Sequence, residues 1–471
     1  MATLNKHYFI NVGANGTFAN SGLVHTSPTD VDALFSYMEQ NDVEKLLIYF
    51  HGGLVSEKDG MTAAENMKNA FADISSKRHV VTFVWETGPV ETFAQNFKEL
   101  IKLSDTSLFN EIIKFVIKIA AKKLGIQDAR GSGEYLSDET IALQKRTTAP
   151  FEDLDKTMNA RSGNVEIDEN NDAEFYAKLE QESRTLVRIQ GSQELQNPTG
   201  DDASRSFFSS AAVTIAKIAF AVLKRYLNKT HHDFYPTVME EAFRKIYLDK
   251  VGTWGWSQMK EKSGDMFKSN TGLSGDSLHA GTYFLTLLNE YIRKRNAAGK
   301  KTEVELIGHS AGSIAVCNLL ASTADNHDTI KYNHVFFLAP ACRTDLFLNT
   351  LKKIGDSALF SKFKMFTMKE ENEKKDHCIP YVYTHSLLYL VSGLFEEEVD
   401  AKIMGLHEQY KSEGRYEVFE ELKALNSYVS KHKLILSDDI TNTDQSMWSG
   451  SLAHGDFDND SHTLSSILKT I

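Results

Sequence analysis

The chain has 471 residues, of which 41% are hydrophobic and 25% are charged, and its formal net charge is −12 at pH 7. This composition is typical of a globular protein and excludes collagen-like and wholly disordered chains. The acidic balance argues against nucleic acid as a partner, because phosphate backbones are bound by broad basic faces. Three widely spaced cysteines and a polar N-terminal stretch indicate neither a disulfide framework nor an export signal, so we expect a cytoplasmic protein.

Short β-branched and aromatic runs alternate with longer helical patterns along much of the chain. We expect helices near Asp30, after the start signal Ser27-Pro28-Thr29, and over 62–77 and 281–294. The expected strands are 7–12, 45–50, 79–85, 302–307, 334–339, 363–368 and 433–436. This order predicts an α/β fold with a mostly parallel twisted sheet and helices on both faces.

The alternation stops between 85 and 302, where several long helical patterns occur without a convincing strand. We therefore expect 1–90 and 300–471 to form one α/β domain and 91–299 to be a large helical cap or lid. The polar segment 131–206 has little periodic hydrophobicity and receives no fixed structure. The apolar stretch 207–227 carries Lys217 near its middle, which favours a buried or lid helix over a membrane span.

The predicted helix over 108–124 is apolar around most of its circumference. Lys114, Lys118 and Lys122 are four residues apart and form one narrow basic stripe. One interpretation is a largely buried helix with a single solvated edge. The other is peripheral contact with an anionic membrane surface, which a basic amphipathic helix can bind.

The most informative motif is Gly308-His309-Ser310-Ala311-Gly312, which follows a predicted strand and precedes a predicted helix. A G-x-S-x-G turn in this context exposes the serine Oγ, and its small glycines let strand and helix approach closely. Ser310 is the candidate nucleophile, and the N–H of Ala311 at the helix start can stabilise an oxyanion. The alternative is a tight turn that happens to contain serine.

A second apolar strand, 45–50, ends in His51-Gly52-Gly53-Leu54. Because Gly52 and Gly53 lack side chains, their backbone can approach a substrate oxygen closely. We expect the N–H of Gly53 or Leu54 to be the second oxyanion donor. The alternative is a flexible turn between strand and helix.

Together the two motifs resemble the α/β-hydrolase superfamily, especially its lipases and esterases, which carry an HG-type loop after an early strand and a nucleophile turn later. The resemblance covers about 1–85 and 302–471 and excludes the insertion. It implies the chain order nucleophile, acid, histidine.

The resemblance directs the search for the acid to residues downstream of Ser310. Asp376 opens the run D-x-x-I-P, which looks like the surroundings of the acid in many of these hydrolases, and is the favoured candidate. Glu370, Glu371 and Glu373 in the same charged loop remain alternatives. Asp345 is a further alternative, since some lipases carry the acid one strand earlier.

The candidate base is His454, which follows the last predicted strand and precedes a terminal helix. A neutral imidazole can take the serine proton near neutral pH, and the neighbouring Gly455 lets the loop project the ring. His462, at the start of that helix, is the rival. We interpret His231-His232-Asp233 as a loop and helix cap rather than metal ligands, and Trp254 and Trp256 as packing anchors.

These residues predict a serine hydrolase that cleaves carboxylic esters, with lipid esters among the candidates, through an acyl-enzyme. The mechanism needs no metal or organic cofactor. Two alternatives stay open: a catalytically silent hydrolase fold that acts as a binding or scaffold protein, and a lipase effector controlled by a protein partner.

Overall fold

The computed structural model describes residues 4–20, 22–53, 55–85, 90–126, 137–162, 174–184, 202–248, 254–355, 359–411 and 416–471. The chain divides into two compact units. The first unit consists of Met1–Phe93, Trp254–Asp376 and Ala401–Ile471, and the second of Ala94–Thr253 and His377–Asp400. The predicted division, 1–90 with 300–471 and 91–299, assigns residues 91–93, 254–299 and 377–400 differently.

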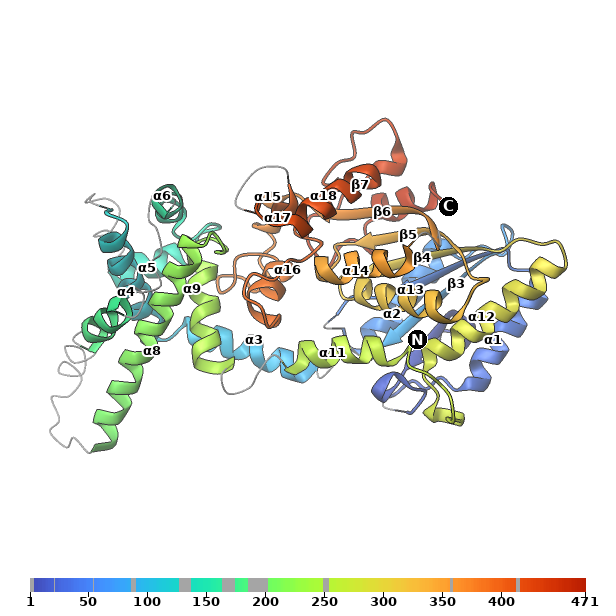
Figure 1. Ribbon diagram of the computed structural model, residues 1–471, viewed down its shortest axis with the longest axis horizontal. Helices are drawn as coiled ribbons and strands as arrows, with labels where there is room; N and C mark the ends of the chain where they lie inside the picture. Colours follow the sequence, from blue (N-terminus) through green and yellow to red (C-terminus); the bar gives the residue numbers. More distant parts are fainter. Residues whose placement is uncertain are drawn as a thin grey trace. The chain divides into compact units, whose positions relative to one another are not determined.

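The first unit contains a seven-stranded parallel sheet (Figure 1). Its strands are β1 (Phe9–Val12), β2 (Lys45–Phe50), β3 (Arg78–Trp85), β4 (Glu303–His309), β5 (Tyr332–Leu338), β6 (Phe360–Met368) and β7 (Lys433–Ser437). Every predicted strand is present within a few residues, which confirms the α/β class. The strand order β1-β3-β2-β4-β5-β6-β7 is not the α/β-hydrolase order, so the sheet topology does not support the narrower fold assignment.

The helices of the first unit connect and cover these strands. They are α1 (Pro28–Gln40), α2 (Glu57–Phe71), α11 (Trp254–Asp265), α12 (Ala280–Ala297), α13 (Gly312–Asn326), α14 (Thr344–Ile354), α15 (Glu370–Glu373), α17 (His407–Tyr410), α18 (Glu420–Lys431) and α19 (Ser461–Leu468). The start of α1 matches the sequence signal, because Ser27 and Asp30 form a reciprocal capping box. Helix α2 begins and ends earlier than the predicted helix 62–77. Its start is fixed by Ser56, whose side chain caps the helix by accepting the N–H of Asp59.

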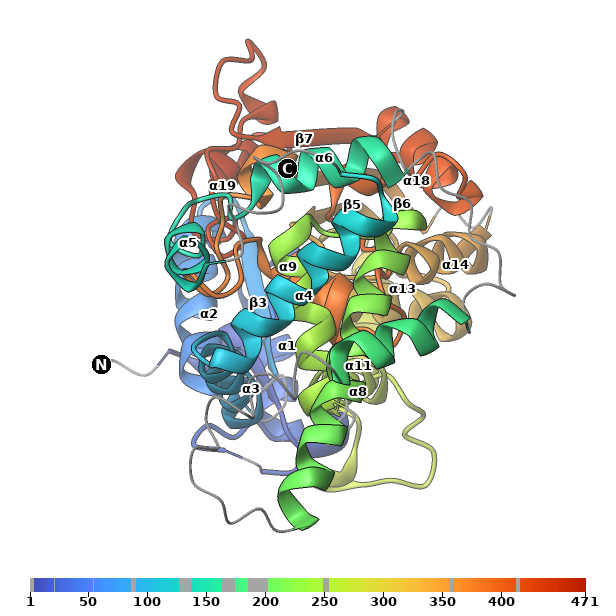
Figure 2. The same ribbon diagram turned by 90° about the vertical axis from the view of Figure 1, so that its left-hand side faces the viewer.

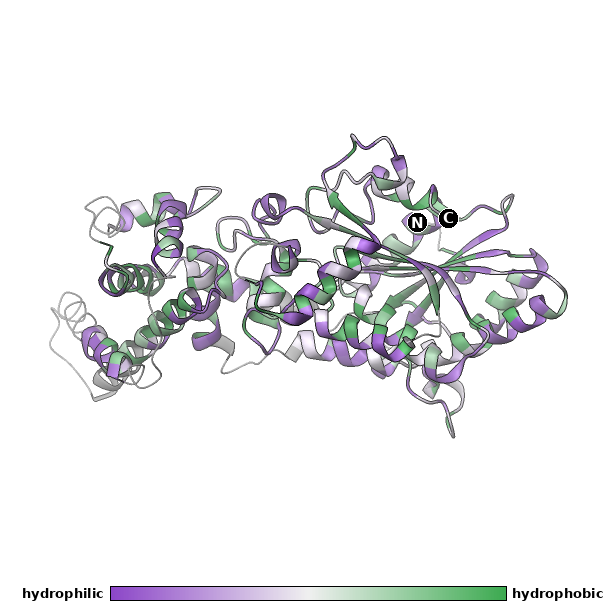
Figure 3. Ribbon diagram, turned by 45° about the horizontal axis from the view of Figure 1, so that its top comes forward, coloured by the Kyte–Doolittle hydropathy of each residue, from purple (hydrophilic) through white to green (hydrophobic). Residues whose placement is uncertain are grey.

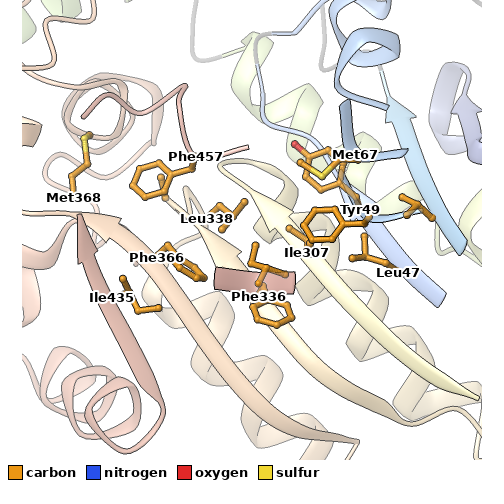
Figure 4. Packing of buried hydrophobic residues seen from close by; sticks show 14 residues of the cluster. Leu47, Tyr49, Met67, Ile307, Phe336, Leu338, Phe366, Met368, Ile435 and Phe457 are labelled. Atoms are coloured by element: carbon orange, nitrogen blue, oxygen red, sulfur yellow. The ribbon is translucent and has the colours of Figure 1, made fainter. Parts of the chain in front are cut away.

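Alternate side chains of the strands build two buried layers. On one face they pack against Met67 and Phe71 of α2 and Ile467 of α19 (Figure 4). The strands and the loop before α19 contribute Leu47, Tyr49, Val80, Ile307, Phe336, Leu338, Ala339, Phe366, Met368, Ile435 and Phe457. Both faces of the sheet are covered, which explains why the strands are nearly continuous apolar runs.

Aromatic side chains dominate the opposite face. Phe35 of α1 packs on Phe284 of α12, which meets Phe83 of β3 edge-on at 5.3 Å between ring centroids. Farther along, Phe337 of β5 contacts Phe347 of α14 at 5.6 Å between ring centroids. Helices therefore cover both faces, as predicted.

The second unit is helical. Its helices are most of α3 (Val90–Ser104), with α4 (Ser107–Lys123), α5 (Asp138–Gln144), α6 (Glu152–Ser162), α8 (Asp202–Leu227), α9 (Phe234–Phe243) and α16 (Leu387–Leu390). Helix α8 contacts both α4 and α9 (Figure 2). Hydrophobic stretches run along these helices, as Figure 3 shows. None of the helices in the described ranges has the length and apolar character that a bilayer crossing needs.

Helix α4 carries the predicted basic stripe, and its apolar residues from Phe109 to Ala120 are mostly buried. Lys114 pairs with Glu111 at 2.7 Å and with Asp138 at 3.0 Å, and Lys122 pairs with Glu182 at 2.6 Å. These contacts favour the interpretation of a packed helix with one solvated edge. Membrane contact stays a prediction.

Much of the polar segment 131–206 lies outside the described residues. Its described part is helical and contains α5, α6, residues 174–184 and the start of α8. The expectation that no fixed structure could be assigned was therefore too broad. Capping supplies a local reason, since Ser137 accepts the N–H of Thr140 at the start of α5.

A buried polar network stabilises the second unit. Arg225 of α8 pairs with Glu241 at 3.3 Å and also with Glu240, and both carboxylates are almost fully buried. His232 joins Glu240 at 2.9 Å and Asp400 at 3.0 Å through its two ring nitrogens. Paired charges avoid most of the cost of burying single ones.

Candidate active site

Ser310 lies in a sharp turn between the end of β4 at His309 and the start of α13 at Gly312. Its φ is +52°, a left-handed conformation that costs energy for a residue with a side chain. Two backbone hydrogen bonds hold this conformation. The N–H of Ser310 donates to the carbonyl of Leu338 at 2.8 Å, and the N–H of Ala341 donates to the carbonyl of Ser310 at 3.0 Å. The turn is therefore built into the sheet through β5.

The flanking glycines are required by close backbone contacts. A Cβ added to Gly312 would lie 2.1 Å from the carbonyl oxygen of Phe50, and one added to Gly308 would lie 2.8 Å from that of Gly312. Real Cβ contacts are longer than either distance, so only glycine allows α13 to pass the end of β2 this closely. The predicted strand–turn–helix geometry of the motif is thus present. Ser310 itself is only 4% exposed, so the prediction that the turn exposes its Oγ is wrong for this conformation.

His454 brings an imidazole to Ser310, the candidate nucleophile. Its Nε2 lies 2.8 Å from the Oγ of Ser310, which is hydrogen-bond distance for proton transfer. The rival His462 lies in the first turn of α19, where its Nδ1 is 3.6 Å from Asp460 and its ring packs near Trp448. Of the two histidines, only His454 is in position to act as a base on Ser310.

The environment of His454 favours the uncharged ring. Burial, together with the charge of neighbouring His309, lowers the pKa of His454 to about 3, and the carboxylate of Asp458 only partly opposes this. The ring is therefore neutral at neutral pH and can accept the serine proton. A base this weak needs its imidazolium stabilised during reaction, since each pKa unit corresponds to about 1.4 kcal/mol.

Asp376, the favoured candidate acid, contacts His454, but it bonds the backbone of that residue and not its ring. Its Oδ2 accepts the N–H of His454 at 2.7 Å. The Nδ1 of His454 is buried and has no hydrogen-bond partner among the described residues. Asp376 thus holds the residue that carries the base, and the ring nitrogen that an orienting acid would bond is not engaged in this conformation.

The other candidate acids make different contacts. Asp345 forms a bidentate pair with Arg343 at the start of α14. Burial of Glu370 is outweighed by a hydrogen bond from Glu408 and by the charges of Lys374 and Lys411, which lower the pKa of Glu370 to about 2. Glu371 faces Lys375 at 4.0 Å. Glu373 is buried in the short helix α15. Among these candidates, within the described residues, Asp376 is the one that bonds His454.

The glycine loop after β2 lies against the nucleophile turn. A Cβ on Gly52 would lie 3.3 Å from the Cβ of Ser310, and one on Gly53 would lie 3.1 Å from that of Ala311. Within the described ranges, the N–H groups of Gly53 and Ala311 have no backbone acceptor. Both can therefore donate to an oxygen bound above Ser310. Leu54, the other predicted donor, lies outside the described residues.

His51 fixes the orientation of this loop. Its Nδ1 donates to the carbonyl of Gly52 at 2.7 Å, and its Nε2 accepts the N–H of Trp85 at 3.1 Å. Burial lowers the pKa of His51 to about 4, which keeps the ring neutral as these bonds require. Because a trans peptide is planar, the N–H of Gly53 points away from the carbonyl that His51 holds.

The site lies where the strand order changes direction. Strand β2 is followed by β3 on one side, whereas β4 pairs with β2 on its other side and the chain then continues through β5. In open parallel sheets, ligands bind at the carboxyl ends of strands beside such a switch point. His51 follows β2 and Ser310 follows β4, so both motifs meet at this position.

Two site residues were not found by sequence reasoning. His309, the second residue of the motif, approaches the carbonyl oxygen of His454 at 3.0 Å through Nε2 and Asp458 at 3.4 Å through Nδ1. Asp458 also accepts the hydroxyl proton of Tyr49 at 2.6 Å. The acidic residues that follow His454 in the sequence could have suggested a carboxylate near the base. Nothing in the sequence spacing, however, predicts that Asp458 contacts Tyr49 of β2.

Two lesser predictions can also be compared with the structure. Trp256 is 2% exposed and packs beside Gly53, whereas the side chain of Trp254 is outside the described residues. The fold brings Asp155 to His231 and Asp233, with ligand atoms within 4.8 Å of one another. Asp155 accepts from Tyr226, and His231 stacks on that ring, so these side chains already make a structural network.

Comparisons of the chain with protein-family models, with curated proteins and with solved structures found no match. The function of the site is therefore argued from its geometry.

Proposed function

We propose that the chain is a serine hydrolase of the α/β-hydrolase kind, which cleaves carboxylic esters through an acyl-enzyme at Ser310. The observation that carries the proposal is the 2.8 Å contact between Ser310 Oγ and His454 Nε2, made from a left-handed turn. A nucleophile in hydrogen-bond contact with a neutral imidazole is the arrangement that nucleophilic catalysis needs. The left-handed turn places the buried Ser310 hydroxyl against His454, and its strain is the cost of that placement.

The proposed reaction has two half-reactions with the same proton carrier. Ser310 Oγ attacks the ester carbonyl carbon while His454 Nε2 takes its proton, and the N–H groups of Gly53 and Ala311 bind the oxyanion. Collapse breaks the ester bond, and the proton on His454 passes to the leaving alkoxide. Water then attacks the acyl-enzyme by the same route and releases Ser310. This chemistry uses no metal or organic cofactor.

Asp376 is proposed as the acid that stabilises the His454 imidazolium. It already bonds the backbone N–H of His454, so a local adjustment of carboxylate and ring would bring it to Nδ1. Asp458, the other nearby carboxylate, is bonded to Tyr49 and faces His309. An acid at Nδ1 would raise the basicity of His454 at the moment of proton transfer.

The strand order gives no support to the hydrolase kind, and the proposal rests on the nucleophile turn, the base and their place at the switch point. A carboxylic ester is the proposed substrate, since the site offers a nucleophile and two oxyanion donors. Lipid esters stay among the proposed substrates as a narrower form of the proposal, although the apolar residues of α4 are packed inside the second unit. Turnover of esters of increasing acyl length tests this part separately.

A fluorophosphonate probe tests the proposal, because it reacts only with an activated serine. We expect labelling of the wild-type chain and none of Ser310→Ala. Ser322→Ala, a buried serine on α13, is the matched control and should label normally. A folded wild-type chain that neither labels nor turns over short-chain esters would favour the alternative of a silent binding or scaffold protein.

A further inference from the structure

His309 lies next to the nucleophile but its ring contacts the base loop. The side chain is 7% exposed. Its Nε2 is 3.0 Å from the carbonyl oxygen of His454, and its Nδ1 is 3.4 Å from Oδ2 of Asp458. The nucleophile turn and the base loop are thereby joined by one imidazole, in addition to the direct contact between Ser310 and His454.

Both ring nitrogens of His309 face hydrogen-bond acceptors. A backbone carbonyl has no hydrogen to give, and the Asp458 carboxylate already accepts the Tyr49 hydroxyl at 2.6 Å on the same oxygen. A neutral imidazole donates from one nitrogen and presents a lone pair at the other. Only the imidazolium can donate to both groups, so the two contacts favour a charged His309.

We propose that His309 is a charged positioning residue, which fixes the base loop through the His454 carbonyl and reduces the basicity of His454 through its positive charge. The inference rests on the proposed hydrolase function. His309 does not contact the reacting atoms, and it acts through His454. Its two effects have opposite consequences, because the clamp orders the base while the charge weakens it.

The groups around His309 support this assignment. Burial opposes the charge, but attraction and hydrogen bonding to Asp458 outweigh it and raise the pKa of His309. Burial also opposes ionisation of Asp458, yet His309 lowers its pKa to about 2. From the end of β2, His51 stays neutral, and from the loop before α19, the His454 ring lies 5.6 Å away between centroids.

A defined pH dependence follows. Above the raised pKa of His309 one donor is lost, the contact to the base loop weakens, and activity falls. Removal of the cation has the reverse effect on the acid side: the His454 imidazolium loses a repulsive neighbour and keeps the attraction of Asp458. Its pKa therefore rises, and the acid limb of the rate profile moves to higher pH.

The test is the pH profile of kcat/KM for the wild type, His309→Gln and the control His462→Gln. The glutamine amide can still donate to the His454 carbonyl but carries no charge. We expect the acid limb of His309→Gln to move up by about one pH unit or more, as removal of a like charge at this separation implies, and its alkaline limb to disappear. The control should keep both limbs. A slower His309→Gln enzyme with both limbs unmoved would reduce His309 to a packing role.

A direct measurement covers the case in which His309→Gln does not fold. Nitrogen-15 histidine spectra of Ser310→Ala should show a doubly protonated ring at His309 at neutral pH, whereas a singly protonated ring would overturn the proposal. The two proposals fail separately. An inactive, unlabelled wild type would contradict the hydrolase function. The nitrogen-15 spectra would still decide whether His309 is charged.

Discussion

Substitution of Gly312 by alanine tests the link between local sterics and the site. The added Cβ would lie 2.1 Å from the carbonyl oxygen of Phe50 and 2.9 Å from that of His51, both backbone atoms of the strand end beside the nucleophile turn. A backbone carbonyl in a sheet cannot turn aside as a flexible side chain can. The chain must move by about 1 Å, and overpacking of this kind costs about 3 kcal/mol or more.

The matched control is Gly455→Ala, in the base loop directly after His454. A Cβ there meets nothing within 4 Å, so we expect unchanged stability and labelling. Gly312→Ala should lower the melting temperature by about 5 °C or more and abolish fluorophosphonate labelling. Both variants are compared by thermal unfolding and by the rate of labelling. Wild-type stability with full labelling in Gly312→Ala would refute the close approach of α13 to the end of β2.

Further predictions concern the base, the acid and the second unit. His454→Ala should lower kcat on a short-chain ester by about 1,000-fold or more, whereas His462→Ala should change it little; the reverse would exchange their roles. Because burial lowers the pKa of His454, its neutral form persists in acid, so kcat/KM should stay level from about pH 7 to about pH 5, unlike that of an ordinary histidine. Asp376→Asn keeps an acceptor for the backbone N–H but removes the charge, and should cost about 100-fold in kcat; an unchanged kcat would limit Asp376 to holding the loop. Arg225→Met leaves the buried Glu240 carboxylate without its cation and should destabilise the second unit by about 3 to 5 kcal/mol, seen as faster hydrogen exchange in α9; unchanged exchange would contradict this.

The sheet was predictable because its strands are buried on both faces. Runs such as 46–50 and 335–339 are apolar throughout and are bounded by polar or glycine-containing segments, so their positions follow from composition alone. The strand order could not be predicted, since it depends on which edges pair across the insertion. The boundaries of the two units also escaped prediction, because residues 377–400 join the second unit from far along the chain.

The site was predictable where the chemistry is local. The G-x-S-x-G motif pointed to Ser310 and the loop position to His454, and the structure contains a contact between these two side chains. Their catalytic roles stay a prediction. The function of Asp376 stays a prediction, as its contact is to the backbone. His309 and Asp458 were missed because their contacts join residues that are far apart in sequence, such as Asp458 with Tyr49 and His309 with His454.

The central claim is that Ser310 forms a covalent acyl-enzyme, and mass spectrometry of a quenched reaction tests it most directly. The chain is mixed with an activated short-chain ester, stopped in acid within the first turnover and digested. We predict an acyl group on the peptide that contains Ser310, absent from Ser310→Ala and longer-lived in Asp376→Asn. Ester turnover without any adduct on Ser310, or with the adduct on another residue, would contradict the claim.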